Sequence, residues 1–411
     1  MKRTWAFLSA LLLLAAPAAV QAQFDYTVNA NNTITITGYS GPGGVVSIPA
    51  SITGLPVSSI AENAFNGCTS LTSVTIPGSV NSIGGGAFID CNSLTAILVD
   101  STNAFYSSLN GVLFDKSQST LIECPGGIAG GYTVPSSVTS IGGNAFYGCA
   151  SLTSVTISVG VTNIGYDAFV YCTSLASVTI PGSVTSIAED AFQDCTLLTS
   201  VSIGNGVTSI GEQAFYGCRS LGSIMIPGSV TSIGEQAFDY CTSLTNVTMY
   251  NGLASIGEYA FELCTGLTNV TIPGSVISIE GCAFFYCTNL TGVFFQGNAP
   301  GVGLNVFIGD NATVYYLPST SGWSSPFANR QALLWNALIQ TSGTSFGVQS
   351  NQFGFNITGT PYIPIVVEGC TNLASPVWTP LQTFTITSGV VYFSEPLQTN
   401  SFGRYYRISS P

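Results

Sequence analysis

The chain has 411 residues, of which 46% are hydrophobic and only 6% charged, and its net charge at pH 7 is −12. It contains no histidine, which excludes Ser-His-Asp and Cys-His catalysis and every histidine-ligated metal site. With seven basic residues against 19 acidic ones, the balance also argues against nucleic acid or an anionic membrane surface as partner.

The first 22 residues have the pattern of a secretory signal peptide. Lys2 and Arg3 precede an apolar run from Trp5 to Ala19, and Val20-Gln21-Ala22 supplies small residues at the expected cleavage spacing. We therefore expect residues 1–22 to be removed and the protein to be exported. The apolar run is shorter than the roughly 20 residues that a spanning helix needs, so no membrane span is expected.

Residues 23–44 are predicted to form an N-terminal β cap. Apolar and polar residues alternate on both sides of Asn31-Asn32, which is typical of a β-hairpin. We expect this hairpin to cover the first turn of the repeat that follows.

A repeat of 23 residues organises the chain from 45 to 317. Cysteines stand at 68 and 91 and then in steps of 23 from 149 to 287, each with Phe three residues before it and Leu three residues after it. One unit cannot bury its own apolar side chains, so the repeat predicts stacked units with one continuous core, a solenoid. Within a unit, Leu-x-x-Val-x-Ile predicts a short strand and the following Pro-Gly a turn. The segment Ile-Gly-x-x-Ala-Phe predicts one helical or 3₁₀ turn on the convex side.

The period of 23 is lost towards the C-terminus. Residues 318–342 are interpreted as a linker and capping segment, in which Phe327 to Leu338 is predicted to be helical. Residues 343–411 alternate short strand patterns with turns rich in Ser, Thr, Gly and Pro, which predicts a small β-sandwich module.

The repeat unit resembles the bacterial leucine-rich repeat of the BspA-like, or Treponema-type, family. That family's pattern is Cys-x-x-Leu-x-x-Ile-x-Leu-Pro-x-x-Leu-x-x-Ile-Gly-x-x-Ala-Phe, and Asn103 to Gly127 resembles its longer variant unit. The resemblance implies a curved leucine-rich repeat solenoid, export, and binding to surfaces or host matrix proteins. Near the C-terminus, "VVEGCTNLASPVWTPL" and "GRYYRISSP" resemble a module on exported proteins of Verrucomicrobia-like bacteria, and this resemblance implies no activity.

The nine cysteines in the repeat register lie inside the apolar pattern. Cysteines one unit apart could come near disulfide distance, but an odd column has no defined pairing. We therefore expect buried free thiols that act as small hydrophobic side chains. Cys282 lies outside the register and is expected to be more exposed, and the chain has no close Cys-x-x-Cys pair for zinc.

Glutamates at 189, 212, 235 and 258 form a column with the same period, about 5 Å apart if units stack as strands do. Three interpretations are open: solvated acids that complement the dipole of the neighbouring turn, a weak cation site, or the carboxylate pair of a glycan hydrolase. No aromatic platform or groove wall accompanies the column, which favours solvated acids. No metal site and no cofactor are assigned, and the weak cation candidates are Glu189, Glu212, Glu235 and Glu258.

Outward-facing strand residues are expected to line the concave face, where repeat proteins of this class usually bind. None of the candidate binding residues is charged. They are Ser73, Thr75, Ser154, Thr156, Ser177, Thr179, Ser200, Ser202, Ser223, Met225, Asn246, Thr248, Asn269 and Thr271. Gly292 and Phe294 continue the series.

The sequence thus predicts an exported, non-enzymatic, adhesion-type protein that binds a macromolecule, protein or glycan, through the solenoid. Short hydroxyl and amide side chains suit hydrogen bonding, and no acid, base or activated nucleophile stands among them. Two alternatives remain: a structural Ser/Thr array that orders water or ice, and a glycan hydrolase that uses the carboxylate column.

Overall fold

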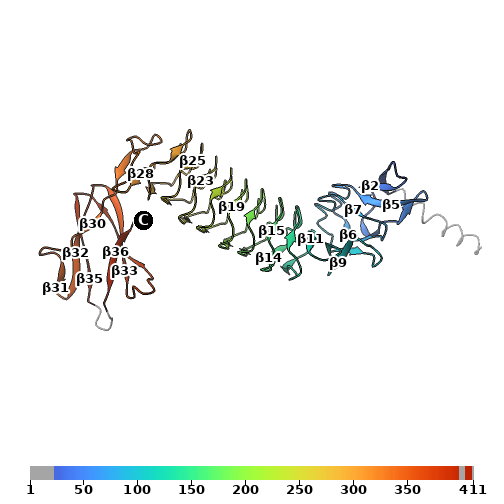
Figure 1. Ribbon diagram of the computed structural model, residues 1–411, viewed down its shortest axis with the longest axis horizontal. Helices are drawn as coiled ribbons and strands as arrows, with labels where there is room; N and C mark the ends of the chain where they lie inside the picture. Colours follow the sequence, from blue (N-terminus) through green and yellow to red (C-terminus); the bar gives the residue numbers. More distant parts are fainter. Residues whose placement is uncertain (1–22, 398–402, 410–411) are drawn as a thin grey trace, which may run out of the picture.

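The computed structural model describes residues 23–397 and 403–409, so the expected signal peptide at 1–22 lies outside the described residues. The described part is built from strands and turns and forms a long solenoid with a β module at its C-terminal end (Figure 1). It contains no helix long and apolar enough to cross a membrane.

The chain begins with an antiparallel hairpin of β1 (Phe24–Val28) and β2 (Ile34–Tyr39). Asn32 at its turn has a φ of 57°, a left-handed conformation that Asn tolerates better than most residues. The hairpin is continuous with the solenoid because β2 pairs in parallel with β5 (Leu55–Ile60). Strand β5 in turn pairs in parallel with β7 (Ser82–Ile83) and antiparallel with β4 (Ser51–Ile52). A second, three-stranded sheet joins β3 (Gly44–Ser47), β6 (Leu71–Ile76) and β8 (Ala96–Val99).

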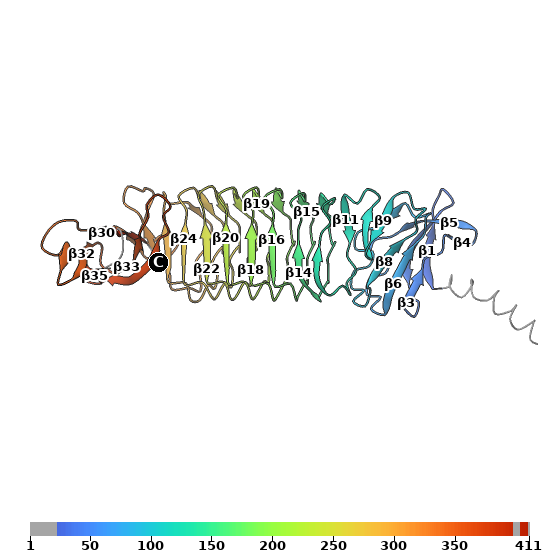
Figure 2. The same cartoon turned by 90° about the horizontal axis from the view of Figure 1, so that it is seen from below.

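Each later turn of the solenoid, here called a rung, contributes one longer and one two-residue strand. The longer strands lie side by side in parallel (Figure 2). They are β12 (Gly130–Thr133), β14 (Leu152–Thr156), β16 (Ser177–Ile180), β18 (Ser200–Ile203), β20 (Ser223–Ile226) and β22 (Asn246–Met249) in one sheet, then β24 (Asn269–Ile272), β26 (Gly292–Phe295), β28 (Thr313–Tyr316) and β29 (Ala332–Leu334) in the next. The register advances by one repeat, so that Val178 lies beside Val201.

The two-residue strands form a second wall, an eleven-stranded sheet that begins with three longer strands. In chain order its members are β9 (Tyr106–Leu109), β10 (Val112–Asp115), β11 (Thr120–Glu123), β13 (Ser140–Ile141), β15 (Asn163–Ile164), β17 (Ser186–Ile187), β19 (Ser209–Ile210), β21 (Ser232–Ile233), β23 (Ser255–Ile256), β25 (Ser278–Ile279) and β27 (Gly301–Val302).

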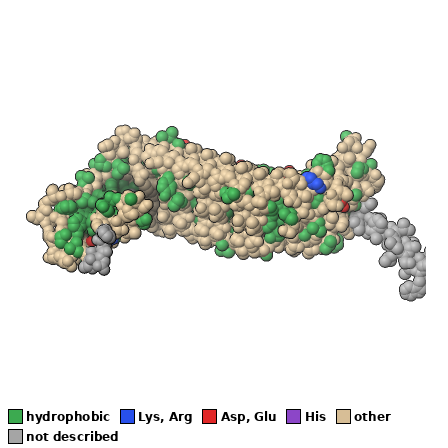
Figure 3. Space-filling model, turned by 60° about the horizontal axis from the view of Figure 1, so that its bottom comes forward, with side chains coloured by type: hydrophobic (Ala, Val, Ile, Leu, Met, Phe, Trp, Pro, Cys, Tyr) green, Lys and Arg blue, Asp and Glu red, His purple; other side chains and the backbone are tan. Residues whose placement is uncertain are grey.

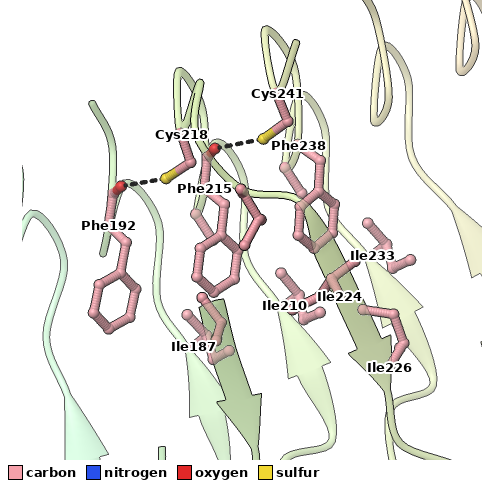
Figure 4. Packing of buried hydrophobic residues seen from close by; sticks show 14 of the residues in the cluster. Ile187, Phe192, Ile210, Phe215, Cys218, Ile224, Ile226, Ile233, Phe238 and Cys241 are labelled. Carbon is pink, nitrogen blue, oxygen red and sulfur yellow. Dashed lines mark hydrogen bonds between the residues drawn. The ribbon is translucent and has the colours of Figure 1, made fainter. Parts of the chain in front are cut away.

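The core is a stack of identical side chains. From Phe146 to Phe307 one phenylalanine per rung stacks on the next, with ring centroids 4.7–5.7 Å apart and planes within 20° of parallel. From Cys172 to Cys287 the cysteine beside each ring donates its thiol hydrogen to the phenylalanine carbonyl of the preceding rung, as Cys218 does to Phe192 at 3.2 Å and Cys241 to Phe215 at 3.3 Å (Figure 4). The stacked units therefore bury what no unit could bury alone.

The expected helical or 3₁₀ turn before each phenylalanine is not formed. Asp190 and Asp194, four residues apart, both adopt left-handed φ angles of 54° and 52°, and the same pair of positions is left-handed in the neighbouring rungs. Alternate amides bond to the next rung: the Phe192 N–H donates to the Ala214 carbonyl at 2.8 Å, whereas the Gln193 N–H donates within the turn to the Asp190 carbonyl at 3.1 Å. Rung-to-rung hydrogen bonds thus replace the i to i−4 bonds of a helix.

A longer unit interrupts the regular stack between Cys91 and Cys149. Here β9, β10 and β11 run antiparallel, and the buried side chains divide into one cluster that ends at Leu113 and another that begins at Val112. Glu123 is buried at this junction, and its Oε1 accepts a hydrogen bond of 2.9 Å from the Phe88 N–H. In regular rungs that amide bonds to an alanine carbonyl of the next rung, so the Glu123 side chain replaces a missing backbone acceptor.

The predicted helix over Phe327 to Leu338 is wrong. That stretch holds β29, which pairs in parallel with β28, and the start of β30 (Leu338–Ile339). Pairing with the exposed edge of β28 satisfies its backbone groups in extended form.

Two sheets make up the C-terminal module. β31 (Gly347–Gln349), β32 (Gln352–Thr358), β35 (Val390–Pro396) and β30 form one, and β33 (Ile363–Cys370), β34 (Thr379–Ile386) and β36 (Tyr405–Ser409) form the other. Their buried side chains share one cluster, which also takes in Phe294 and Tyr315 from the solenoid.

Candidate binding surface

The candidate surface is the outer side of the long strands β14 to β24, called here the strand face. Along β16, Val178 and Ile180 are buried whereas Ser177 and Thr179 are exposed, as the alternation of a strand requires. Register brings equivalent side chains of neighbouring rungs together: Ser154 pairs with Ser177, and Ser177 with Ser200. The result is a row of short, uncharged hydrogen-bonding side chains across adjacent rungs.

All fourteen predicted residues carry at least partly accessible side chains. Those that the structure leaves exposed are Ser154, Thr156, Ser177, Thr179, Ser200, Ser202, Ser223, Met225 and Asn246. The remaining ones are half-buried: Ser73, Thr75, Thr248, Asn269 and Thr271. Accessibility is therefore greatest in the middle of the solenoid.

The C-terminal module covers the last rungs of the same surface. Phe294 and Tyr315 would point outward from β26 and β28, yet they are only 4% and 7% exposed because the module packs on them. Their rings stack with centroids 4.8 Å apart, and the Trp335 indole N–H donates to the Pro364 carbonyl of the module at 2.9 Å. Phe294 is thus core rather than a member of the binding series.

One hollow interrupts the strand face. A cavity of about 690 Å³ lies at the ends of β18, β20 and β22, between the Met225 and Tyr250 side chains. Its lining residues are Ile203, Asn205, Met225, Pro227, Gly228, Ser229, Tyr250 and Asn251. Of these, only Met225 was among the predicted residues.

A signal for this hollow exists in the repeat itself. The units of β16, β20 and β24 follow the strand with Pro-Gly-Ser, but the units of β18 and β22 have Gly204-Asn205-Gly206 and Tyr250-Asn251-Gly252 instead. The hollow lies where two such turns flank the Pro227-Gly228 turn.

The face in Figure 3 is dominated by polar side chains and backbone, with scattered apolar patches and very few charged groups. An uncharged surface of this kind offers hydrogen bonds and shape but little long-range electrostatic steering.

The glutamate column lies elsewhere in the rung. Each member lies two residues after a two-residue strand, at the start of the following turn, and is exposed: Glu189, Glu212, Glu235 and Glu258. No group of three or more side chains placed to hold a metal ion occurs in the described ranges. The geometry fits solvated surface acids.

Two acids near that column are less solvated. Burial, together with the like charges of Asp167 and Glu189, raises the pKa of Asp190 to about 6. Burial, with the like charge of Glu262 beside it, raises the pKa of Asp239 to about 7. Each lies among other acids, Asp190 near Asp167 and Glu189 and Asp239 near Glu262, so both are destabilised in their charged form by burial beside like charges.

All twelve cysteines are free, and eleven are buried while Cys68 is half-buried. Burial raises the pKa of thiols such as Cys195 well above its usual range, which makes them poor nucleophiles. Cys282, expected to be more exposed, is only 8% exposed because it lies in the tight turn that bonds to the next rung. The thiols are part of the core and not of a reactive site.

Comparison with known proteins identifies the repeat. The model of the BspA type leucine rich repeat region matches six copies, over residues 46–129, 131–231 and 208–325, which is more than half of the chain. A search of curated protein sequences finds no match. The match ends before the C-terminal module, whose resemblance to modules of Verrucomicrobia-like bacteria stays a prediction.

Several solved structures are similar to this chain. A leucine rich cell surface protein from Faecalibacterium prausnitzii is 26% identical over 76% of this chain and 93% of its own, with a TM-score of 0.39. A leucine-rich repeat protein from Eubacterium ventriosum is 22% identical over 74% and 97%, with a TM-score of 0.46. The T. pallidum leucine rich repeat protein is 28% identical over 60% and 88%, with a TM-score of 0.28. On the strength of the repeat match, the chain belongs to the family of BspA-type leucine-rich repeat proteins.

Proposed function

We propose that this protein is an exported, non-enzymatic binding protein that holds a macromolecule, protein or glycan, against the strand face. The observation that carries the proposal is the row of exposed, uncharged Ser, Thr and Asn side chains that register aligns across β14 to β22. Many weak contacts along such a row add up because the ligand meets them together. Export follows from the signal-peptide pattern of residues 1–22.

An adhesion role is consistent with the membership of the family. Leucine-rich repeat proteins bind macromolecules, and BspA-type members are typically found at the cell surface or secreted. No acid, base or activated nucleophile stands among the strand-face residues, so the surface supports recognition rather than turnover.

The test replaces Thr156, Thr179 and Thr248 together by Lys. These side chains point away from the core, so the fold and its circular dichroism spectrum should persist, while three long charged side chains obstruct the row. Binding of the wild type and the variant is measured on a glycan array and against a random-peptide phage library. We expect the wild type to bind members of one of these two collections and the triple variant to lose them.

A matched control changes the charge of the other column. Replacing all four glutamates of the column by Gln should leave binding unchanged, because they lie outside the strand face. Normal binding by the Lys variant together with loss in the Gln variant would move the site to the acids. A wild type that binds neither collection but inhibits ice recrystallisation would favour the structural alternative.

A further inference from the structure

We propose that the hollow at Met225 is the anchor pocket of the strand face, and that it receives an uncharged apolar side chain from a polypeptide partner. This proposal rests on the proposed function and deepens it, because it selects a protein over a glycan and assigns the residues that make the strongest contact.

The pocket is formed by changes in the repeat on both sides of β20. The turns after β18 and β22 lack the usual proline and run close to their neighbours: a Cβ on Gly206 would lie 1.8 Å from the Gly182 carbonyl oxygen, and one on Gly252 would lie 1.9 Å from that of Gly228. Only glycine fits at these two positions, so both turns are fixed in place. They present Asn205 and Asn251 on either side of the intervening Pro227-Gly228 turn.

Its chemistry is an apolar floor inside a polar rim. Ile203, Met225 and Pro227 supply the aliphatic lining, and the Tyr250 ring stands beside them. Met225 is 55% exposed and Tyr250 48% exposed, although both are large apolar side chains that folding could have buried. An apolar centre with a polar rim, enriched in Met and Tyr, is the usual anatomy of a protein–protein interface.

The type of occupant follows from what the pocket lacks. None of its lining residues is charged, so an inserted charged side chain would be buried without a partner. A sugar ring packs its C–H face best on aromatic rings, and Tyr250 is the single aromatic residue among the lining residues, beside aliphatic side chains that offer its hydroxyl groups no hydrogen bonds. An apolar side chain buries neither an unpaired charge nor unpaired hydroxyl groups, and the flexible thioether of Met225 can adapt to an aliphatic or aromatic group.

One hydroxyl beside the pocket differs from its counterparts in other rungs. In other rungs the equivalent hydroxyls are used internally: Ser183 donates to the Val161 carbonyl at 2.6 Å and Ser275 to the Leu253 carbonyl at 2.7 Å. Ser229, which lines the pocket, is different, because its Oγ has no hydrogen-bond partner within the described residues. Since that Oγ is buried, a partner cannot reach it, and the pocket binds through its apolar floor and polar rim.

The experiment selects binders from a random-peptide phage library on the folded full-length protein and measures their affinity for four variants. Met225→Lys and Tyr250→Ser alter the pocket, Met225→Leu keeps it apolar, and Val159→Lys serves as the matched control. Val159 is 85% exposed at the same strand edge, two repeats before Asn205, and does not line the pocket. A change at an interface anchor of this kind costs at least tenfold in affinity.

We expect the selected peptides to share an apolar residue, to bind Met225→Lys and Tyr250→Ser at least about tenfold more weakly than the wild type, to bind Met225→Leu more tightly than Met225→Lys, and to bind Val159→Lys as tightly as the wild type. Peptides that are insensitive to both pocket variants but lost on the Thr156, Thr179 and Thr248 triple variant would overturn the pocket and leave the strand face standing. Binding only to neutral oligosaccharides on the glycan array would overturn the polypeptide partner. Peptide binding that survives both sets of changes would overturn the strand face itself.

Discussion

Buried Glu123 predicts a pH dependence of stability that is centred on one side chain. Burial raises the pKa of this carboxyl from 4.5 to about 8, and the hydrogen bond from the Phe88 N–H offsets only part of that rise. The folded state therefore binds a proton that the unfolded state has released at any pH between these two values. The stability that this group contributes is fully present below the unfolded pKa and is lost as the pH rises towards the folded one, by on the order of 5 kcal/mol across that window.

Replacing Glu123 by Gln removes the titration and keeps an oxygen that can accept from the Phe88 N–H. We expect the variant to be more stable than the wild type at about pH 8 and nearly equal to it at about pH 5. Glu123→Ala instead leaves the buried amide without an acceptor and should destabilise this junction at both pH values, by about 1–3 kcal/mol before any cavity is counted.

The measurement is urea denaturation followed by circular dichroism at several pH values, with hydrogen exchange of residues 84–98 as the local readout. Asp190 and Asp239 also have raised pKa values and lose stability in the same direction. They are present in both proteins, so the difference between wild type and Glu123→Gln isolates Glu123. Parallel pH profiles for the two proteins would refute the reasoning.

Two further predictions concern the stack of rungs. Leu198→Ala and Phe215→Ala each remove a fully buried side chain and should lower the free energy of unfolding by about 2–5 kcal/mol, with increased hydrogen exchange confined to the adjacent rungs. Increased exchange throughout residues 343–397 would contradict local coupling. In native protein the thiols should resist a thiol-specific reagent, with Cys68 the first to react and all twelve labelled after denaturation; inter-rung disulfides found by mass spectrometry would contradict this.

The solenoid could be predicted from the sequence because its evidence is repeated nine times. The 23-residue spacing of Phe, Cys and Leu requires equivalent positions to stack, and the alternation in Leu-x-x-Val-x-Ile assigns one face of each strand to the core. The outward positions Ser177 and Thr179 follow from the same alternation, and the structure leaves both exposed.

Features that depend on contacts between distant segments could not be predicted in this way. The sequence of a single 23-residue unit does not predict that Asp190 and Asp194 adopt left-handed conformations, because the hydrogen bonds that favour these conformations come from the next rung. Phe294 looks like an outward strand residue until the module, some 50 residues later, packs over it. The pocket at Met225 arises where two irregular turns flank a regular one, and each turn alone reads as an ordinary loop.

The direction of the rung-to-rung hydrogen bonds has a mechanical consequence. Bonds such as that from Phe192 to Ala214 join successive rungs, so the rung interfaces carry end-to-end tension in series and rupture one at a time. A rung that detaches frees 23 residues, which extend to roughly 76–83 Å of chain at about 3.3–3.6 Å per residue. Rungs of nearly identical composition yield at similar forces. Under a steady pull the molecule would therefore lengthen in equal steps and dissipate mechanical work at each step, which limits the force that reaches a bound partner.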